Sequence, residues 1–315
     1  MLARPDIGFA FTALLPVFLI VVLGLGLRLA RLVGQDQWRA IDHVCYYVLF
    51  PAIIVKAIAT ADLTGVPVAG MATAIVLGLI TMFALLLGLR RPLSDLLDLN
   101  GPAFSSVFQG STRFHAFIML AIVPAILGSE ALALAALAAV AMIPTLNVAC
   151  VIVVSVLGRG TPPGLLFVSR MLATNPFILA CLAGVALKVL APPLPDPIVE
   201  TLDLVGRGAL GLALLATGAG LSLHTAVSAK APVALAVMLK LLVMPAIIAF
   251  WTWALGIDGL PQAVAILAAA VPTGAGSYIL ARQLGGDAPL IAGILTAQVA
   301  AAAVTLPLVV AFISI

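Results

Sequence analysis

Long stretches without charge are the feature of this sequence that most limits how it can fold. The 21 residues from Ile7 to Leu27 include no charged side chain, and similar apolar runs recur along the chain. Of the 315 residues, 64% are hydrophobic and 9% are charged, whereas a soluble domain carries about 25% charged residues. Lipid must therefore solvate much of the chain.

The apolar runs indicate helices. In lipid every backbone polar group needs an internal partner, which leaves helices or closed barrels. The runs are continuous and rich in Leu and Ala, whereas barrel strands would alternate. The first run is longer than the apolar core of a signal peptide, and Arg28 and Arg31 follow it, so we interpret it as a retained span. The predicted fold class is an all-α polytopic membrane protein.

Ten segments approach the length of about 20 apolar residues that a span requires. In chain order they are 7–27, 38–60, 66–89, 102–127, 131–157, 171–190, 199–223, 231–255, 261–282 and 288–312. Their connections are short, so we expect no soluble domain. The longest polar stretch predicts a cytoplasmic linker at 158–170 between two halves, 1–157 and 171–315.

The basic residues predict the orientation. Nine of them fall on the odd-numbered loops: Arg28, Arg31, Arg39, Arg90, Arg91, Arg159, Arg170, Lys230 and Arg282. The opposite side has only Arg4 and Lys188. Because cytoplasmic loops carry the excess of Lys and Arg, we expect the odd-numbered loops in the cytoplasm and both termini outside.

The two halves share a pattern. Pro16, Gly24 and Arg28 recur at the same intervals as Pro176, Gly184 and Lys188, and Leu127 to Ala131 is echoed by Leu284 to Ala288. Five spans per half is an odd number, so the second half must enter the membrane in the opposite sense. The sequence thus predicts an inverted-topology repeat, which is typical of secondary transporters.

The fourth span is interrupted by polar residues, Gln109 to His115. Arg113 lies in the middle of the apolar run, where a charge costs roughly 2.5–3.5 kcal/mol on insertion scales. Gly110, Ser111 and Thr112 can unwind a helix. We therefore predict a broken helix with Arg113 and His115 at a binding site; the alternative is an arginine paired only for packing.

The ninth span contains Pro272, Thr273, Gly274, Gly276, Ser277 and Tyr278. Proline removes a helix hydrogen bond, and the freed backbone groups need other partners. Interrupted spans in corresponding places of two halves are a pointer to a transporter site. We expect this break to meet that of the fourth span, and the alternative is a packing kink.

Several other residues have simpler expected roles. Asn147 in the fifth span either braces a neighbouring helix or joins the site. Lys56 can extend to the membrane surface, and Arg207 is expected to pair with Asp203, four residues earlier. Lys240 lies deep in the eighth span and stays ambiguous. The cysteines (Cys45, Cys150 and Cys181) lie in apolar runs and predict neither disulfides nor a metal site.

These segments resemble the auxin efflux carrier family, which includes the plant PIN carriers and lies in a wider group with the bile acid:sodium symporters. Residues 271–287 are similar to the family's ninth span and the loop after it, and 108–117 to the fourth span of its bacterial members. Residues 143–148 resemble the fifth span, and 240–245 the eighth. The resemblance covers essentially the whole chain.

The resemblance implies ten spans as two inverted five-helix repeats whose fourth and ninth helices cross at their breaks. It also implies a scaffold of spans one, two, six and seven, and small organic anions as substrates. Family members often have Asn in each crossover, where this chain has His115 and Gly276, so auxin specificity does not follow. The short linker favours a compact member in a bacterial inner membrane.

We therefore expect a secondary transporter that moves a small organic anion, with export as the expected direction. A sodium-coupled symporter of the bile acid type is the alternative, and coupling to protons, sodium or no ion stays open. An intramembrane enzyme is less expected, since His43, His115 and His224 are far apart and no HExxH motif occurs.

The predicted partners are the substrate, the bilayer and, as an open option, a second copy of the chain. The net charge of +3 gives no reason to expect nucleic acid as a partner. We expect no cofactor beyond a coupling ion. The predicted substrate-binding residues are Gly110, Ser111, Thr112, Arg113, His115, Asn147, Pro272, Thr273, Gly274, Gly276, Ser277 and Tyr278.

Overall fold

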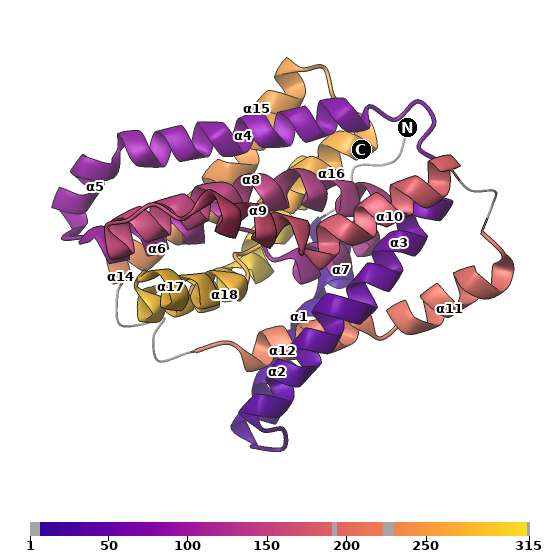
Figure 1. Ribbon diagram of the computed structural model, residues 1–315, viewed down its shortest axis with the longest axis horizontal. Coiled ribbons are helices and arrows are strands. Elements are labelled where there is room, and N and C mark those ends of the chain that lie inside the picture. Colours follow the sequence, from indigo (N-terminus) through magenta and orange to yellow (C-terminus); the bar gives the residue numbers. More distant parts are fainter. Residues whose placement is uncertain (1–6, 191–193, 223–229, 314–315) are drawn as a thin grey trace.

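All of the secondary structure described in the first half of the chain is helical. The computed structural model describes residues 7–190, 194–222 and 230–313, so the termini and His224 lie outside the described residues. Its helices up to the middle of the chain are α1 (Ile7–Leu29), α2 (Gln35–Val44), the π-helix η1 (Cys45–Leu49), α3 (Phe50–Thr60), α4 (Val68–Gly88), α5 (Arg90–Leu97), α6 (Gly101–Thr112), α7 (Ala116–Leu127) and α8 (Ala131–Arg159). Figure 1 shows α4 and α8 running side by side.

The second half is also helical in the described residues. Its helices are α9 (Leu165–Ala173), α10 (Pro176–Leu190), α11 (Asp196–Gly206), α12 (Ala209–Ala219), α14 (Lys230–Met238), the π-helix η2 (Leu239–Val243), α15 (Met244–Ala254), α16 (Gly259–Ala270), α17 (Gly276–Leu284) and α18 (Ala288–Phe312). The linker predicted at 158–170 runs from the end of α8 into α9, so part of it is a short helix.

The helix lengths confirm a polytopic membrane protein. Seven helical segments of the described chain are long and apolar enough to cross a membrane, and an eighth is added if α9 and α10, bent by 52°, count as one span. The two remaining predicted spans consist of shorter helices. Arg207 and Gly208 separate α11 from α12, and residues 271–275 separate α16 from α17. Ten spans and their inverted repetition stay predictions.

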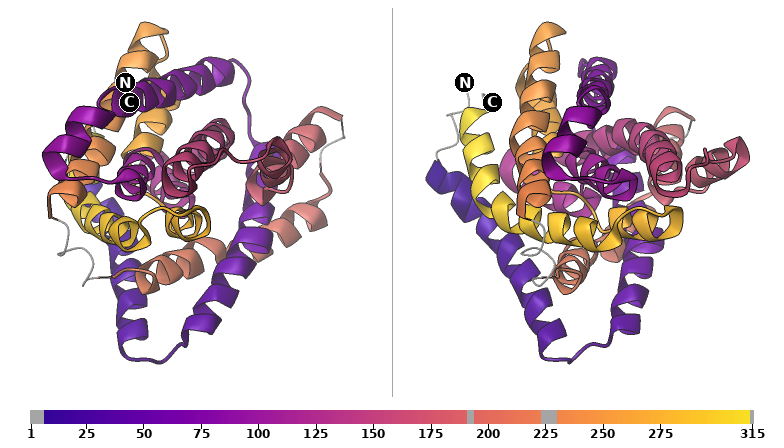
Figure 2. Two further views of the ribbon diagram at one scale, coloured as in Figure 1. Left: turned by 60° about the vertical axis from the view of Figure 1, so that its left-hand side comes forward. Right: turned by 90° about the vertical axis from the view of Figure 1, so that its left-hand side faces the viewer.

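The helices pack in two groups. In one, α1 packs along α12, and α3 packs against α10 and α11. In the other, α4, α6, α7 and α16 pack around α8, while α15 contacts α4, and α14 contacts α18. Figure 2 shows α1 and the continuous run α2–η1–α3 as two arms of a V joined by the short loop after α1.

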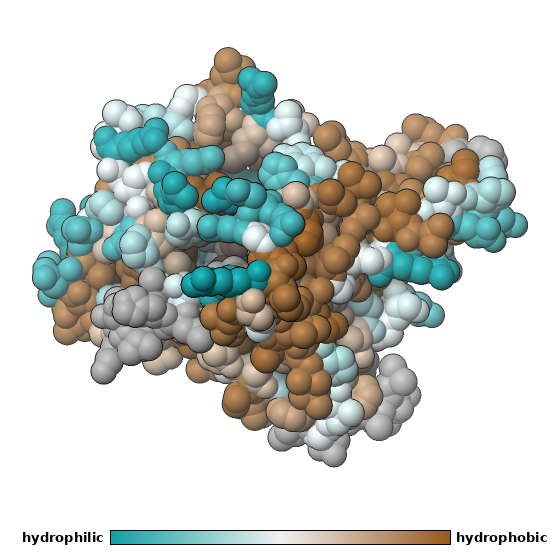
Figure 3. Space-filling view, turned by 90° about the horizontal axis from the view of Figure 1, so that it is seen from below, coloured by the Kyte–Doolittle hydropathy of each residue, from teal (hydrophilic) through white to brown (hydrophobic). Residues whose placement is uncertain are grey.

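The outer surface is largely apolar, as a lipid-facing surface must be. Phe9, Leu19 and Leu23 on α1 and Trp253 on α15 are all more than half exposed. Figure 3 shows one face on which hydrophobic residues form broad areas between hydrophilic ones. Contiguous exposed apolar areas of this kind are rare on soluble monomers, so lipid is the fitting solvent for them.

Close backbone contact joins α1 to α12. A Cβ atom on Gly218 would lie 1.8 Å from the carbonyl oxygen of Val21, and one on Gly24 would lie 2.0 Å from that of Leu215. The absence of a side chain at Gly24 and Gly218 therefore permits this approach of the two helices. Gly211 on the same helix has no atom within 4 Å of the corresponding position, so it serves no such contact.

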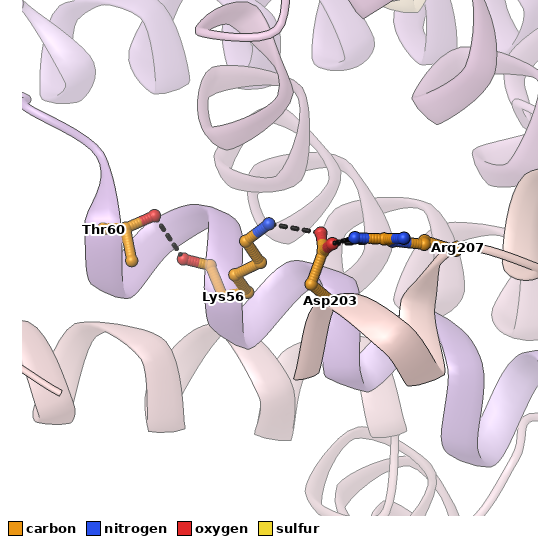
Figure 4. Close-up of polar contacts among 4 residues, drawn as sticks. All are labelled: Lys56, Thr60, Asp203 and Arg207. Atoms are coloured by element: carbon orange, nitrogen blue, oxygen red, sulfur yellow. Dashed lines mark hydrogen bonds and ion pairs between the residues drawn. The ribbon is translucent and has the colours of Figure 1, made fainter. Parts of the chain in front are cut away.

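Lys56 forms an ion pair between helices. Its ammonium donates to Asp203 of α11, and Arg207 forms the expected pair with Asp203 at 2.8 Å (Figure 4). Spacing along the sequence does not reveal the pair of Lys56 with Asp203, because the two residues are 147 positions apart, and the extension of Lys56 to the membrane surface stays a prediction. The three residues connect α3 and α11.

Candidate functional site

The first break lies in the middle of the predicted fourth span. Helix α6 ends at Thr112, Arg113 and His115 have extended backbones, and α7 begins at Ala116. Thr112 donates its hydroxyl to the Phe108 carbonyl at 2.8 Å, a type of side-chain bond that competes with the helix ladder. The interruption predicted from residues 110–115 is present.

The second break lies in the predicted ninth span. Helix α16 ends at Ala270, Val271 is extended, and α17 begins at Gly276. Pro272 has no N–H and cannot continue the ladder. A Cβ atom on Gly274 would lie 3.0 Å from the Phe114 carbonyl oxygen and 3.5 Å from the His115 Cα. The two breaks are therefore in contact, and a glycine allows their close approach.

A cavity of about 520 Å³ lies beside the two breaks. Five of the predicted site residues line it: Arg113, His115, Asn147, Gly274 and Gly276. Its other walls come from α2 and η1, from the junction of α9 and α10, and from α17. A cavity of this size falls in the range that holds small molecules.

Arg113 supplies a positive charge to this cavity. Its Nη2 donates to Asn147 Oδ1 at 3.1 Å, and its Nη1 is buried without a hydrogen-bond partner in the described chain. The described residues contain three ion pairs, and Arg113 is in none of them. A half-buried guanidinium held by a neutral amide retains its capacity for an anion.

Aromatic side chains form the opposite part of the site. Phe117 and Phe177 line the cavity, and both stack on the buried Phe50, at centroid distances of 4.3 and 5.8 Å. The Tyr46 hydroxyl accepts a bond from Asn175 Nδ2 at 3.2 Å. The cavity thus offers a cation and an apolar wall to one ligand.

His115 faces another helix as well as the cavity. Its exposed fraction is 4%, and its Nε2 lies 3.3 Å from Thr217 Oγ1 on α12. Its ring centroid is 5.8 Å from that of Phe117. His115 therefore connects the first break to the group of helices that contains α12.

Seven predicted site residues do not line the cavity: Gly110, Ser111, Thr112, Pro272, Thr273, Ser277 and Tyr278. Gly110 packs on α18, where an added Cβ would lie 2.7 Å from Ile294. Thr273 and Ser277 are buried and bond to each other at 3.0 Å. Tyr278 is on the outside, with the guanidinium of Arg282 5.9 Å from its ring centroid.

Other cavity residues were missed by the sequence reasoning, namely Asp42, His43, Tyr46, Asn175 and Gln283. Asp42 and His43 precede the apolar part of the second span, so the sequence predicts that they lie on the surface at the end of a helix. Asn175 directly precedes Pro176 at the start of the sixth span. Nothing local in these segments indicates that they meet the two breaks.

The described residues contain no group of three or more His, Cys, Asp or Glu side chains that could hold a metal ion. The three cysteines are free and buried. His43 of α2 and His115 of the first break both line the cavity, so these two histidines are closer than the sequence suggested.

Comparison with known proteins gives one clear match. A family model described as "membrane transport protein" matches residues 9–162 and 164–310. The match covers nearly the whole chain, and it includes both breaks and every residue of the cavity. No curated protein matches the chain.

Proposed function

Because this chain belongs to the membrane transport protein family, the auxin efflux carrier family that its sequence resembles, we propose that it is a secondary transporter of a small organic carboxylate. The proposed mechanism is alternating access, with the substrate bound where the fourth and ninth spans cross. Two inverted repeats, 1–157 and 171–315, would supply one broken helix each. The family indicates a transporter rather than an enzyme.

The single observation that carries this proposal is the state of Arg113. It lines the cavity with one buried nitrogen that has no hydrogen-bond partner in the described chain, and Asn147, which accepts a bond from its other terminal nitrogen, is neutral. A substrate carboxylate would supply the missing counter-charge through a bidentate pair, the geometry that guanidinium favours.

The ends of the broken helices support an anion at the same place. Ala116 and Gly276, the first residues of α7 and α17, both line the cavity. Helix N-termini carry a partial positive charge and unpaired amides. Both half-helices therefore favour negative charge near Arg113.

The position of the cavity supports a cytoplasm-facing state. Asp42, Asn175 and Gln283 line it and lie near helix ends that lead into the Arg-rich loops. Those loops are the ones that the positive-inside rule assigns to the cytoplasm. Loading from the cytoplasm agrees with export as the direction.

Reconstitution in lipid vesicles tests the proposal. We expect saturable counterflow of a labelled carboxylate from a panel of monocarboxylates and dicarboxylates, and its loss in Gly274→Leu. Replacing sodium with potassium, and collapsing the proton gradient in a separate arm, distinguishes the sodium-coupled alternative from proton-coupled and uncoupled transport. A well-folded protein that binds and exchanges no carboxylate in the panel would contradict the proposal.

A further inference from the structure

The second break exposes one backbone amide and one carbonyl that a continuous helix would join. In an α-helix the Thr273 amide would donate to the Ala269 carbonyl. Here the Thr273 amide donates to Gln298 Oε1 at 2.8 Å, and the Ala269 carbonyl accepts from Lys240 Nζ at 2.8 Å. The donor and the acceptor of one missing helix hydrogen bond thus each bond to a side chain instead, Gln298 of α18 and Lys240 of η2.

The first break uses the same glutamine. In a continuous helix the Gly110 carbonyl would accept from the Phe114 amide. Here it accepts from Gln298 Nε2 at 2.9 Å, and the same nitrogen donates to the Ala236 carbonyl of α14 at 2.9 Å. One amide group therefore contacts both breaks and a third helix.

The arrangement leaves little freedom. Gln298 and Lys240 both have exposed fractions of 0%, so water cannot substitute for the bonds that they make. One donor and two acceptors surround the Gln298 amide, which fixes the orientation of its oxygen and nitrogen. Losing it would remove a partner from each of three backbone groups, and a backbone group left buried without a partner is destabilising.

We propose that Gln298 is a positioning residue that ties the two breaks into one unit, with Lys240 securing the end of α16. The breaks then move together during transport, and the contact of Gly274 with Phe114 is preserved as Arg113 is presented to substrate. This proposal rests on the proposed function for its consequence in transport, but the tie itself is a property of the protein without substrate.

Hydrogen–deuterium exchange of the purified protein tests the tie directly. In Gln298→Met, a substitution of similar size, we expect amides in both breaks, 110–116 and 271–277, to exchange at least tenfold faster than in the parent. Thr296→Val on the same helix is the matched control, because it removes a part-buried bond that Thr296 Oγ1 accepts from the Ser222 amide, and the other bond of this hydroxyl goes to Ala292, outside both breaks. In Thr296→Val the amides of both breaks should exchange at the same rate as in the parent.

A second variant covers the case in which Gln298→Met does not fold. Gln298→Glu keeps the shape, and its ionised carboxylate can accept from Thr273 but cannot donate to Gly110 or Ala236. We expect the first break, which loses its donor, to exchange faster than in the parent at neutral pH and to recover in part at acidic pH, where a protonated carboxyl donates one bond. A folded Gln298→Met in which only one break, or neither, changes would overturn the proposal, as would a folded Gln298→Glu in which the first break exchanges as in the parent.

Binding measurements separate this proposal from the proposed function. Where the parent binds a carboxylate, Gln298→Met or Gln298→Glu should weaken its Kd tenfold or more, while Thr296→Val should leave it within about twofold. A parent that binds no carboxylate would contradict the transport proposal, and the exchange result would still decide whether Gln298 ties the breaks.

Discussion

Arg113 lies in the first break and Asn147 on α8, and Nη2 of the arginine donates a 3.1 Å hydrogen bond to Oδ1 of the asparagine. The bond fixes the guanidinium beside the cavity without neutralising it, since a side-chain amide carries no charge. An acidic residue in the same place would have satisfied the arginine internally. The neutral partner therefore leaves the charge of Arg113 without a counter-ion at this position.

Asn147→Asp should weaken carboxylate binding tenfold or more. The substitution keeps the shape of the side chain but gives Arg113 a fixed counter-ion, which then competes with the substrate. Asn147→Ala should cost less, because it removes only an orienting bond. Both are measured as Kd by calorimetry on purified protein. Equal affinity in the parent and Asn147→Asp would show that Asn147 does not face the bound anion.

Gly274→Ala should impair transport more than Gly276→Ala. A Cβ atom on Gly274 would press on the Phe114 carbonyl at 3.0 Å, whereas one on Gly276 would make an ordinary contact, 3.8 Å from Arg113 Nη2. Gly274→Leu should abolish counterflow with insertion intact. The measurement is counterflow at matched protein amounts, and a fully active Gly274→Leu would contradict the contact between the breaks.

Gly218→Ala should destabilise the protein, whereas Gly211→Ala should not. The added methyl group on Gly218 overlaps the backbone of α1, and overpacking of this kind typically costs about 1–3 kcal/mol. Gly211 has open space around it, so alanine there should be neutral or slightly stabilising through helix propensity. Thermal melting in detergent compares the two, and equal melting temperatures would count against the close packing of α1 on α12.

The orientation can be tested by labelling single cysteines. Cysteines placed at Asp6 and at the exposed Gly65 should react with an impermeant thiol reagent on intact cells, and one at the exposed Gly160 should react only after lysis. The three native cysteines are buried and should add little background. The opposite pattern would reverse the orientation and the assignment of the cavity to the cytoplasm.

The sequence identified features that have a local chemical cause. Pro272 with its neighbouring glycines, and Gly110 to Arg113, mark the two breaks because each local pattern is incompatible with a regular helix in lipid. Asp203 and Arg207 are one helical turn apart, so their pairing follows from spacing alone. The membership of the family also followed from short segments in the correct order.

Features that depend on packing could not be identified in this way. Gln298 was missed because it is one neutral residue in a long apolar helix, although a buried amide in lipid always needs partners. Ser111 and Thr273 have the right chemistry for a site, yet both are buried in the protein and neither lines the cavity. Asp42 and Asn175 reach the cavity only because α2 and α10 pack beside the breaks.

The most direct test of the account is the affinity of Arg113→Gln for a carboxylate that the parent protein binds. If Arg113 pairs with the substrate, the Kd should rise tenfold or more, equivalent to about 1.4 kcal/mol, and Arg113→Lys should restore binding only in part, because an ammonium cannot form the bidentate pair. An unchanged Kd in Arg113→Gln, with the same expression and melting temperature as the parent, would show that the arginine is structural and that the cavity is not an anion site.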